Sequence, residues 1–172
     1  MLNMDFTKNL VIETEPMDWE LSPLSGVNRK RLAYEEIEQG HATSIVEFQA
    51  GAHFRRHDHP LGEEILVLDG VFSDDSGDFK AGSYFRNPEG FIHAPFSKEG
   101  CLIFVKLHQF QPEDTRRVVI DTKATEWLPG QGNLEVMPLH EFAGEHTALV
   151  KWPAGERFVY HQHWGGEEIF VL

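Results

Sequence analysis

The chain has 172 residues, with 15 Lys or Arg and 28 Asp or Glu, so its formal net charge is −13 at pH 7. This length is enough for one well-buried domain, or for one domain and part of another. The negative charge repels phosphate groups and argues against nucleic-acid and anionic-membrane partners. The single cysteine excludes an internal disulfide, and no apolar run is long enough to cross a bilayer. We therefore expect a cytoplasmic protein with no membrane partner.

Short apolar or alternating runs, separated by turns rich in Gly, Pro and Asp, recur along the chain. Residues 10–12 and 65–68 are apolar runs, the segment 101–107 begins with the apolar run 101–105, and residues 42–49 alternate between apolar and polar side chains. These patterns predict strands, and residues 79–86 predict another. No long helical period is present. The sequence therefore predicts an all-β sandwich or barrel.

Three features that suggest a function have simpler interpretations. The basic run at residues 28–31 favours a solvated strand or loop over a nucleic-acid patch. The acidic run at residues 74–78 lacks the glycine and the terminal glutamate of an EF-hand, and predicts a solvated hairpin turn instead of a calcium loop. Cys101 begins an apolar run, so we expect it to pack as a small hydrophobic side chain.

His57 and His59 are the first candidate metal ligands. They are two residues apart, so their rings would project from the same face of an extended strand. A tight turn at residues 60–62, which Pro and Gly favour, would return Glu63 beside them. His93 follows a later turn and would be the fourth ligand. Three neutral imidazoles and one carboxylate suit zinc, iron, manganese or nickel, and are too rich in nitrogen for calcium or magnesium.

The second part of the chain repeats the first. Residues 155–172 reproduce residues 51–68, with His161, His163 and Glu167 each 104 positions after its counterpart. These three residues predict a second, incomplete metal site.

We predict a complete first unit at residues 1–112 and a second unit at residues 113–172 that is incomplete at its C-terminus. The second copy stops at Leu172, within a strand whose counterpart continues to Gly70, and it contains no counterpart of His93. Either the second unit is truncated or another chain completes it, and we favour truncation.

An incomplete barrel leaves strand edges and apolar faces open. We therefore expect the second unit to pack on the first, or on another copy in a homo-oligomer, through Phe158, Tyr160 and Trp164. Water, His140 or His146 would fill the gap in the second metal site.

The two ligand-bearing segments resemble the paired motifs of the cupin superfamily. The first has a glycine, His-x-His, Glu and Gly; the second has Gly, Pro-x-Gly and His, and departs only at Ser97, where the family usually has asparagine. The resemblance implies a cupin double-stranded β-helix, a jelly-roll barrel. It also implies that the metal ligands are His57, His59, Glu63 and His93. Glu64 is the alternative to Glu63 as the carboxylate ligand. The other interpretations are a surface hairpin with accidental histidines and a cupin barrel with a vestigial site.

Residues 63–74, 82–88 and 93–101 resemble the ChrR-like cupins more specifically. This group includes the C-terminal domain of the anti-sigma factor ChrR and relatives similar to acetylacetone-cleaving dioxygenases. The resemblance to ChrR implies a zinc-binding regulatory or stress-sensing module. ChrR grips its sigma factor through a separate helical N-terminal domain that is missing from this sequence, so we do not expect sigma-factor binding by that route.

The alternative that the resemblance implies is an iron-dependent dioxygenase acting on a small chelating substrate such as a β-diketone. Those relatives use an all-histidine triad, whereas Glu63 would add a charged ligand here. Aromatic residues such as Phe85 and Phe96 would line a substrate pocket or belong to the barrel core. We expect a regulatory metal-binding module first, an oxygenase second and a purely structural protein third.

Overall fold

The computed structural model describes residues 1–36, 39–157 and 159–172. Over these residues the chain forms strands and no helix, and so contains no helix long and apolar enough to span a membrane. The all-β prediction is therefore confirmed. In chain order the strands are β1 (Glu20–Leu21), β2 (Val27–Glu36), β3 (Gln39–Phe48), β4 (His57–Asp58), β5 (Glu63–Asp74), β6 (Gly77–Lys80), β7 (Ser83–Asn87), β8 (Ile92–His93), β9 (Cys101–Leu107), β10 (Val118–Asp121), β11 (Leu128–Pro129), β12 (Glu135–Phe142) and β13 (Glu145–Lys151).

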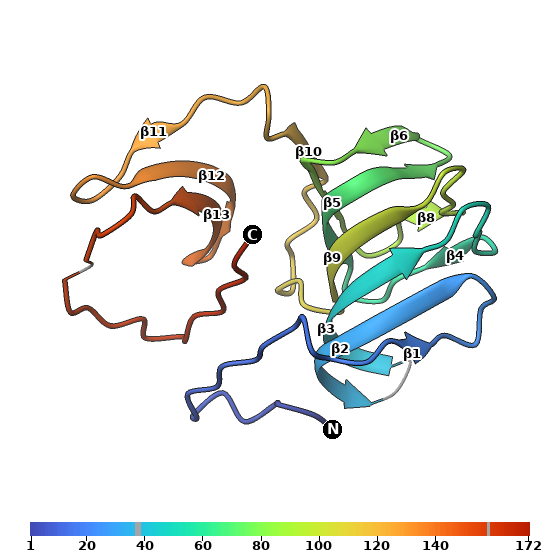
Figure 1. Ribbon diagram of the computed structural model, residues 1–172, viewed down its shortest axis with the longest axis horizontal. Coiled ribbons are helices and arrows are strands. Elements are labelled where there is room, and N and C mark those ends of the chain that lie inside the picture. Colours follow the sequence, from blue (N-terminus) through green and yellow to red (C-terminus); the bar gives the residue numbers. More distant parts are fainter. Residues whose placement is uncertain (37–38, 158) are drawn as a thin grey trace.

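The largest sheet has the order β1-β2-β3-β9-β5-β7-β10, with β6 paired to β5 outside this path. Its neighbouring strands are all antiparallel. Strands β4 and β8 form a separate two-stranded sheet. Figure 1 shows these strands gathered in one body on the right of the molecule. Most of the neighbours in this sheet are distant in sequence, so segments far apart in the chain meet here.

The alternation of side chains along β5 decides which of them enter the core. Glu63, Ile65 and Val67 are buried, whereas Glu64 and Leu66 between them are only half-buried. Successive residues of a strand point to opposite faces, so Glu63 lies on the same face as the apolar core residues. The core comprises Val27, Val46, Phe48, Ala52, Ile65, Val67, Phe72, Phe79, Phe85, Cys101, Ile103 and Val105. The carboxylate of Glu63 therefore lies inside the fold, on the side of the apolar core.

Two strand predictions need correction. Residues 10–12 form no strand, and Leu10 and Val11 are exposed. An apolar run becomes a stable strand only where it pairs with neighbours, and this run pairs with none of the described strands. Residues 79–86 form two strands, because the chain turns at Gly82, whose φ of +92° suits glycine.

The acidic and basic runs are parts of strands and turns. The predicted hairpin at residues 74–78 joins β5 to β6, with the backbone N–H of Ser76 donating to Asp74 Oδ1 at 2.7 Å. The basic run lies in β2, and its Lys30 is buried, with Nζ donating to the carbonyl oxygen of Thr14 at 2.8 Å. Lys30 therefore holds the segment around Thr14 against β2 and has a structural role.

The second part of the chain contributes to two sheets. Strand β10 pairs with β7 at the edge of the large sheet, and β11, β12 and β13 form a separate three-stranded sheet. Figure 1 shows the latter on the left, with the C-terminal end of the chain between it and the large sheet. Because β10 belongs to the large sheet, the unit boundary after residue 112 stays a prediction.

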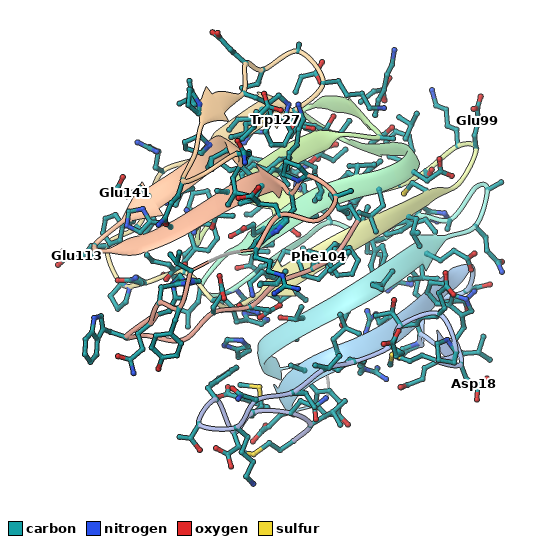
Figure 2. The ribbon with its side chains drawn as sticks, turned by 60° about the vertical axis from the view of Figure 1, so that its left-hand side comes forward. Asp18, Glu99, Phe104, Glu113, Trp127 and Glu141 are labelled. Atoms are coloured by element: carbon teal, nitrogen blue, oxygen red, sulfur yellow. The ribbon has the colours of Figure 1, made fainter. Side chains whose placement is uncertain are left out.

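Apolar contacts pack the second part of the chain onto the first, but through other residues than predicted. Met137 from β12 is fully buried in a cluster with Tyr84 from β7. The rings of Phe104 and Phe170 stack with centroids 4.4 Å apart, and Figure 2 labels Phe104 on this face of the sheet. Tyr160 and Trp164 are 94% and 93% exposed, so neither makes this contact, and Phe158 lies outside the described residues.

A buried polar cluster also joins the two parts. Arg86 of β7 is 1% exposed and donates from Nη1 to Asp114 Oδ2 at 2.7 Å and from Nε to Glu64 Oε2 at 3.2 Å. His140 of β12 contacts the same Asp114 oxygen at 2.8 Å. Burial disfavours the Asp114 anion, but the bonds from Arg86 and His140 outweigh it and lower the pKa of Asp114. The buried guanidinium of Arg86 is therefore paired with carboxylates, as its burial requires.

Candidate metal centre

Three histidines from two short strands and a turn lie close together. His57 of β4 is directly opposite His93 of β8, and His59 follows two residues after His57. The ring centroid of His57 lies 4.6 Å from that of His59 and 5.1 Å from that of His93. One nitrogen of each ring lies within 4.8 Å of the others. Such a group of imidazole nitrogens can hold a metal ion.

The turn after His59 returns the chain to the site. Gly62 has φ +71° and donates its N–H to the carbonyl oxygen of His59 at 3.0 Å. A Cβ there would lie 2.8 Å from the carbonyl oxygen of Asn87, so the turn requires glycine. The predicted turn is present, but β4 pairs with β8 and not with β5.

Glu63, and not Glu64, lies beside the histidines. Glu63 is 3% exposed; its Oε2 lies 3.3 Å from His59 Nε2, and its Oε1 lies 3.2 Å from His93 Nε2. Asn87 donates to Oε1 at 2.8 Å. Burial raises the pKa of Glu63, against the opposing effects of His93 and Asn87. Glu64 points to the opposite face and pairs with Arg86.

His93 is oriented by a carboxylate that the sequence reasoning missed. Its Nδ1 lies 3.1 Å from Asp74 Oδ2, and Asp74 in turn accepts bonds from the N–H and hydroxyl of Ser76. Burial lowers the pKa of His93, but the Asp74 bond and the Glu63 charge outweigh it, so the net shift is upward. The Asp74 carboxyl has a lowered pKa, because the same bonds outweigh its burial. The only sequence signal for Asp74 is that it ends a buried strand at a hairpin.

The inner nitrogen of His93 faces other acceptors. Nε2 has no hydrogen-bond partner among the described residues, and in the neutral ring that donates Nδ1–H to Asp74 this nitrogen presents a lone pair. Yet Glu63 Oε1 is 3.2 Å away. Two lone pairs facing each other inside a protein need a proton or a cation between them. This arrangement fits a bound metal ion.

The other two imidazoles are suited to the same role. His57 donates Nδ1–H to the carbonyl oxygen of Arg55 at 2.7 Å, so its Nε2 carries the free lone pair. Burial lowers the pKa of His57, and burial with the neighbouring histidines lowers that of His59 to about 3. Both rings are therefore neutral at pH 7, the state that binds metals. Because Glu63 and His93 are buried, the interpretation as a surface hairpin with accidental histidines is wrong.

The second motif brings its predicted ligands together on an exposed segment. Ligand atoms of His161, His163 and Glu167 lie within 4.8 Å of one another, and all three residues are exposed. The two proposed gap fillers have other partners: His140 contacts Asp114, and His146 lies 3.8 Å from a carboxylate oxygen of Glu141. Neither belongs to the second cluster.

Other residues singled out in the sequence belong to the framework. Phe85 is fully buried in the core, and Phe96 is half-buried. Cys101 is also in the core, where burial raises the pKa of its thiol to about 11, so it is an unreactive thiol at neutral pH. Ser97 is fully buried and donates to the carbonyl oxygen of Val71 at 2.7 Å.

The solved structures that match this chain include two proposed dioxygenases and a complex of a sigma factor with its anti-sigma factor. A proposed dioxygenase from Nostoc punctiforme is 17% identical, with a TM-score of 0.62, over 74% of this chain and 52% of its own. A proposed acetylacetone dioxygenase from Methylibium petroleiphilum is 18% identical, with a TM-score of 0.54, over 67% of this chain and 92% of its own. The complex of Rhodobacter sphaeroides SigE with the anti-sigma ChrR matches at 22% identity and a TM-score of 0.46, over 55% of this chain and 51% of the matched chain.

The chain thus spans about half the length of the Nostoc and Rhodobacter chains. No curated protein matches it. The two dioxygenase-like structures support the predicted cupin fold, and the fold is all they support at such low identity. A model of the ChrR cupin-like domain matches residues 7–111 and 115–172. Since this match covers nearly the whole chain, the protein belongs to the ChrR cupin-like domain family.

Proposed function

We propose that the first unit binds one divalent metal ion through His57, His59, Glu63 and His93, and that zinc is the resident ion. The observation that carries this proposal is the buried His93 Nε2, which faces Glu63 and two further imidazoles without a hydrogen-bond partner among the described residues. Leaving a buried polar atom unpaired costs about 1–3 kcal/mol, and a cation would remove that cost. Iron, manganese and nickel suit the same donors.

His161, His163 and Glu167 form a second, weaker site in this proposal. Their donor atoms are as close together as those of the first triad, but all three residues are exposed. Exposed ligands must give up their hydration and side-chain freedom on binding, so the affinity of this site is lower.

We further propose a regulatory, stress-sensing role of the anti-sigma-factor type, which family membership supports. His57 and His59 are only partly buried, so a small molecule from solvent can reach the centre. When bound, the metal would supply a Lewis-acid centre at the residues that hold it. A sigma factor is the protein partner to test, by size-exclusion chromatography of the mixed proteins. The same measurement on this protein alone tests the proposed homo-oligomer through Tyr160 and Trp164.

The alternative is a metal-dependent dioxygenase acting on a chelating substrate such as a β-diketone. The same partial exposure of His57 and His59 favours it, since a substrate needs access to the metal. The buried Glu63 carboxylate distinguishes this centre from an all-histidine triad.

Metal content of the protein purified without added metal tests the metal proposal. We expect about one equivalent of zinc that the double variant His57→Ala/His59→Ala loses. The matched variant His161→Ala/His163→Ala should keep it. Unchanged metal content in the first variant would mean that the ligands are wrong, and a metal-free unmodified protein would favour a vestigial site.

Oxygen uptake separates the sensor from the enzyme. The protein is loaded anaerobically with ferrous ion and mixed with β-diketones and related chelating acids in air-saturated buffer. Absence of turnover with every compound, together with tightly held zinc, supports the sensor. Turnover that His57→Ala/His59→Ala abolishes supports the dioxygenase.

A further inference from the structure

One arginine, Arg117, borders the metal centre from the segment that precedes β10. In the pairing of β10 with β7, Val118 is opposite Arg86, so Arg117 comes next to Asn87. Its Nε donates to Asn87 Oδ1 at 3.2 Å, and its Nη2 donates to Ser76 Oγ at 2.9 Å. The guanidinium carbon also lies 4.7 Å from the centre of the Phe91 ring. Two bonds and a ring contact thus fix one exposed side chain.

The two acceptors of Arg117 begin two hydrogen-bond chains that end on different proposed ligands. Asn87 continues from Nδ2 to Glu63 Oε1 at 2.8 Å. Ser76 continues from its hydroxyl to Asp74 Oδ1 at 2.6 Å, and the other oxygen of Asp74 lies 3.1 Å from His93 Nδ1. The guanidinium of Arg117 is therefore linked by hydrogen bonds to both Glu63 and His93.

The direction of these bonds matters for the ligands. A guanidinium can only donate, so Asn87 must present its oxygen to Arg117 and its NH₂ group to Glu63. Likewise the Ser76 oxygen accepts from Arg117, which leaves its hydroxyl hydrogen for Asp74. Arginine stays protonated at every accessible pH, and its planar fork holds separate N–H donors in a fixed geometry for two acceptors, whereas lysine has one nitrogen on a flexible stem.

We propose that Arg117 is a positioning residue of the metal centre, which sets the orientation of Glu63 through Asn87 and of His93 through Ser76 and Asp74. This inference rests on the proposed metal binding by the first unit. It makes the affinity of that centre depend on a residue of the predicted second unit, which no ligand motif contains.

The test measures zinc affinity of the full chain by competition with a chromophoric chelator. Outer partners of metal ligands typically contribute 10–100-fold in affinity, and for a residue one bond further out we expect Arg117→Ala to weaken binding by about tenfold. Arg117→Lys, which keeps the charge but not the fork, should lie between Arg117→Ala and the unmodified protein. Arg116→Ala is the matched control, because this exposed neighbour contacts His140 instead.

A spectroscopic measurement separates positioning from a general effect on folding. In the cobalt-substituted protein, the visible absorption bands should shift in Arg117→Ala and not in Arg116→Ala, while the two metal-free variants should melt at the same temperature. Adding Asn87→Ala to Arg117→Ala should weaken binding by less than the product of the two single effects.

Equal zinc affinity in Arg117→Ala and the unmodified protein would overturn this inference alone. So would an equal loss in Arg116→Ala, or a loss with unchanged cobalt bands. If the unmodified protein binds neither zinc nor cobalt, the proposed function fails and this inference fails with it.

Discussion

The two ligand motifs have nearly the same local geometry in very different surroundings. The ring centroids of His57 and His59 are 4.6 Å apart at 78°, and those of His161 and His163 are 4.7 Å apart at 80°. In each motif the first histidine lies close to the carbonyl oxygen two residues before it, at 2.7 Å and 2.9 Å. The last histidine lies 3.3 Å from its glutamate in the first motif and 3.4 Å in the second. A segment of seven residues therefore sets the arrangement of three ligands.

What differs is everything contributed from elsewhere in the chain. The histidine and glutamate side chains of the first motif are 17% and 4% exposed, and those of the second are 46% and 45% exposed. The first motif also has His93 opposite His57, with Asp74 behind it. Local sequence brings ligands together, whereas distant strands bury them and fix their hydrogen bonds. The experiments below separate these two contributions.

The largest expected effect is removal of a histidine pair. In His57→Ala/His59→Ala the metal of the first unit should be lost. A ligand present at 100 times its dissociation constant stabilises by about 2.7 kcal/mol, which corresponds to roughly 5–10 °C in melting temperature for a protein of this size. In His161→Ala/His163→Ala the melting temperature should stay the same. Calorimetry with and without a chelator checks this, and equal losses in both variants would mean that burial does not distinguish the sites.

The next effect concerns the support of His93. Asp74→Asn keeps the shape of the side chain but removes the charge that holds the Nδ1–H of His93. We expect zinc binding to weaken by about 10–100-fold, the usual cost of losing such a partner. The matched control is Asp75→Asn, since this exposed neighbour pairs with Arg56 instead. Competition titrations measure the zinc affinity of both variants. An unchanged affinity in Asp74→Asn would show that zinc binding does not need the support that Asp74 gives to His93.

The sequence predicts the ligands that lie close together in the chain, but not the partners that come from distant strands. Spacing predicts His57, His59 and Glu63 as ligands, because a turn of three residues relates them. Asp74 and Asn87 were not identified as partners. Their contacts depend on strand register, such as the pairing of Glu63 with Asn87 across β5 and β7, and no local pattern fixes that register.

The fold shows a similar limit. Alternation and apolar runs predicted β3, β5 and β9, since their burial repeats along the strand. Residues 10–12 have an equally apolar sequence but form no strand. The similar apolar run at Val119 and Ile120 lies in strand β10, because it pairs with the edge of β7. Two runs of similar composition thus differ in structure because only one of them pairs with a neighbouring strand.

A smaller effect tests the cluster that fastens β12 to the first unit. The pKa of Asp114 in the folded protein lies below its ordinary value of 3.8, so its ionised form stabilises the fold above that pH, and this contribution is lost as the pH falls through the lowered value. Asp114→Asn leaves Arg86 without one charged partner. We expect a loss of about 1–3 kcal/mol at pH 7.

The pH series supplies the check on that loss. In urea unfolding, the difference between Asp114→Asn and the unmodified protein should shrink as the pH falls below 3.8. Glu141→Gln, at the exposed pair with His146, should cost almost nothing at any pH. A difference that is independent of pH would mean that Asp114 acts through shape and not through charge.

The smallest effect concerns the contact between the second motif and the first unit. Lys106 of β9 pairs with Glu168 at 2.8 Å, and these side chains are 22% and 43% exposed. Exposed ion pairs contribute about 0.2–1 kcal/mol and are screened by salt, so Glu168→Ala should lower stability by no more than that and only at low ionic strength. Glu135→Ala, which breaks the exposed pair with Lys151 inside the three-stranded sheet, is the matched control. A loss well above 1 kcal/mol in Glu168→Ala alone would show that this pair, and not only the stacked Phe104 and Phe170, holds the second motif on the barrel.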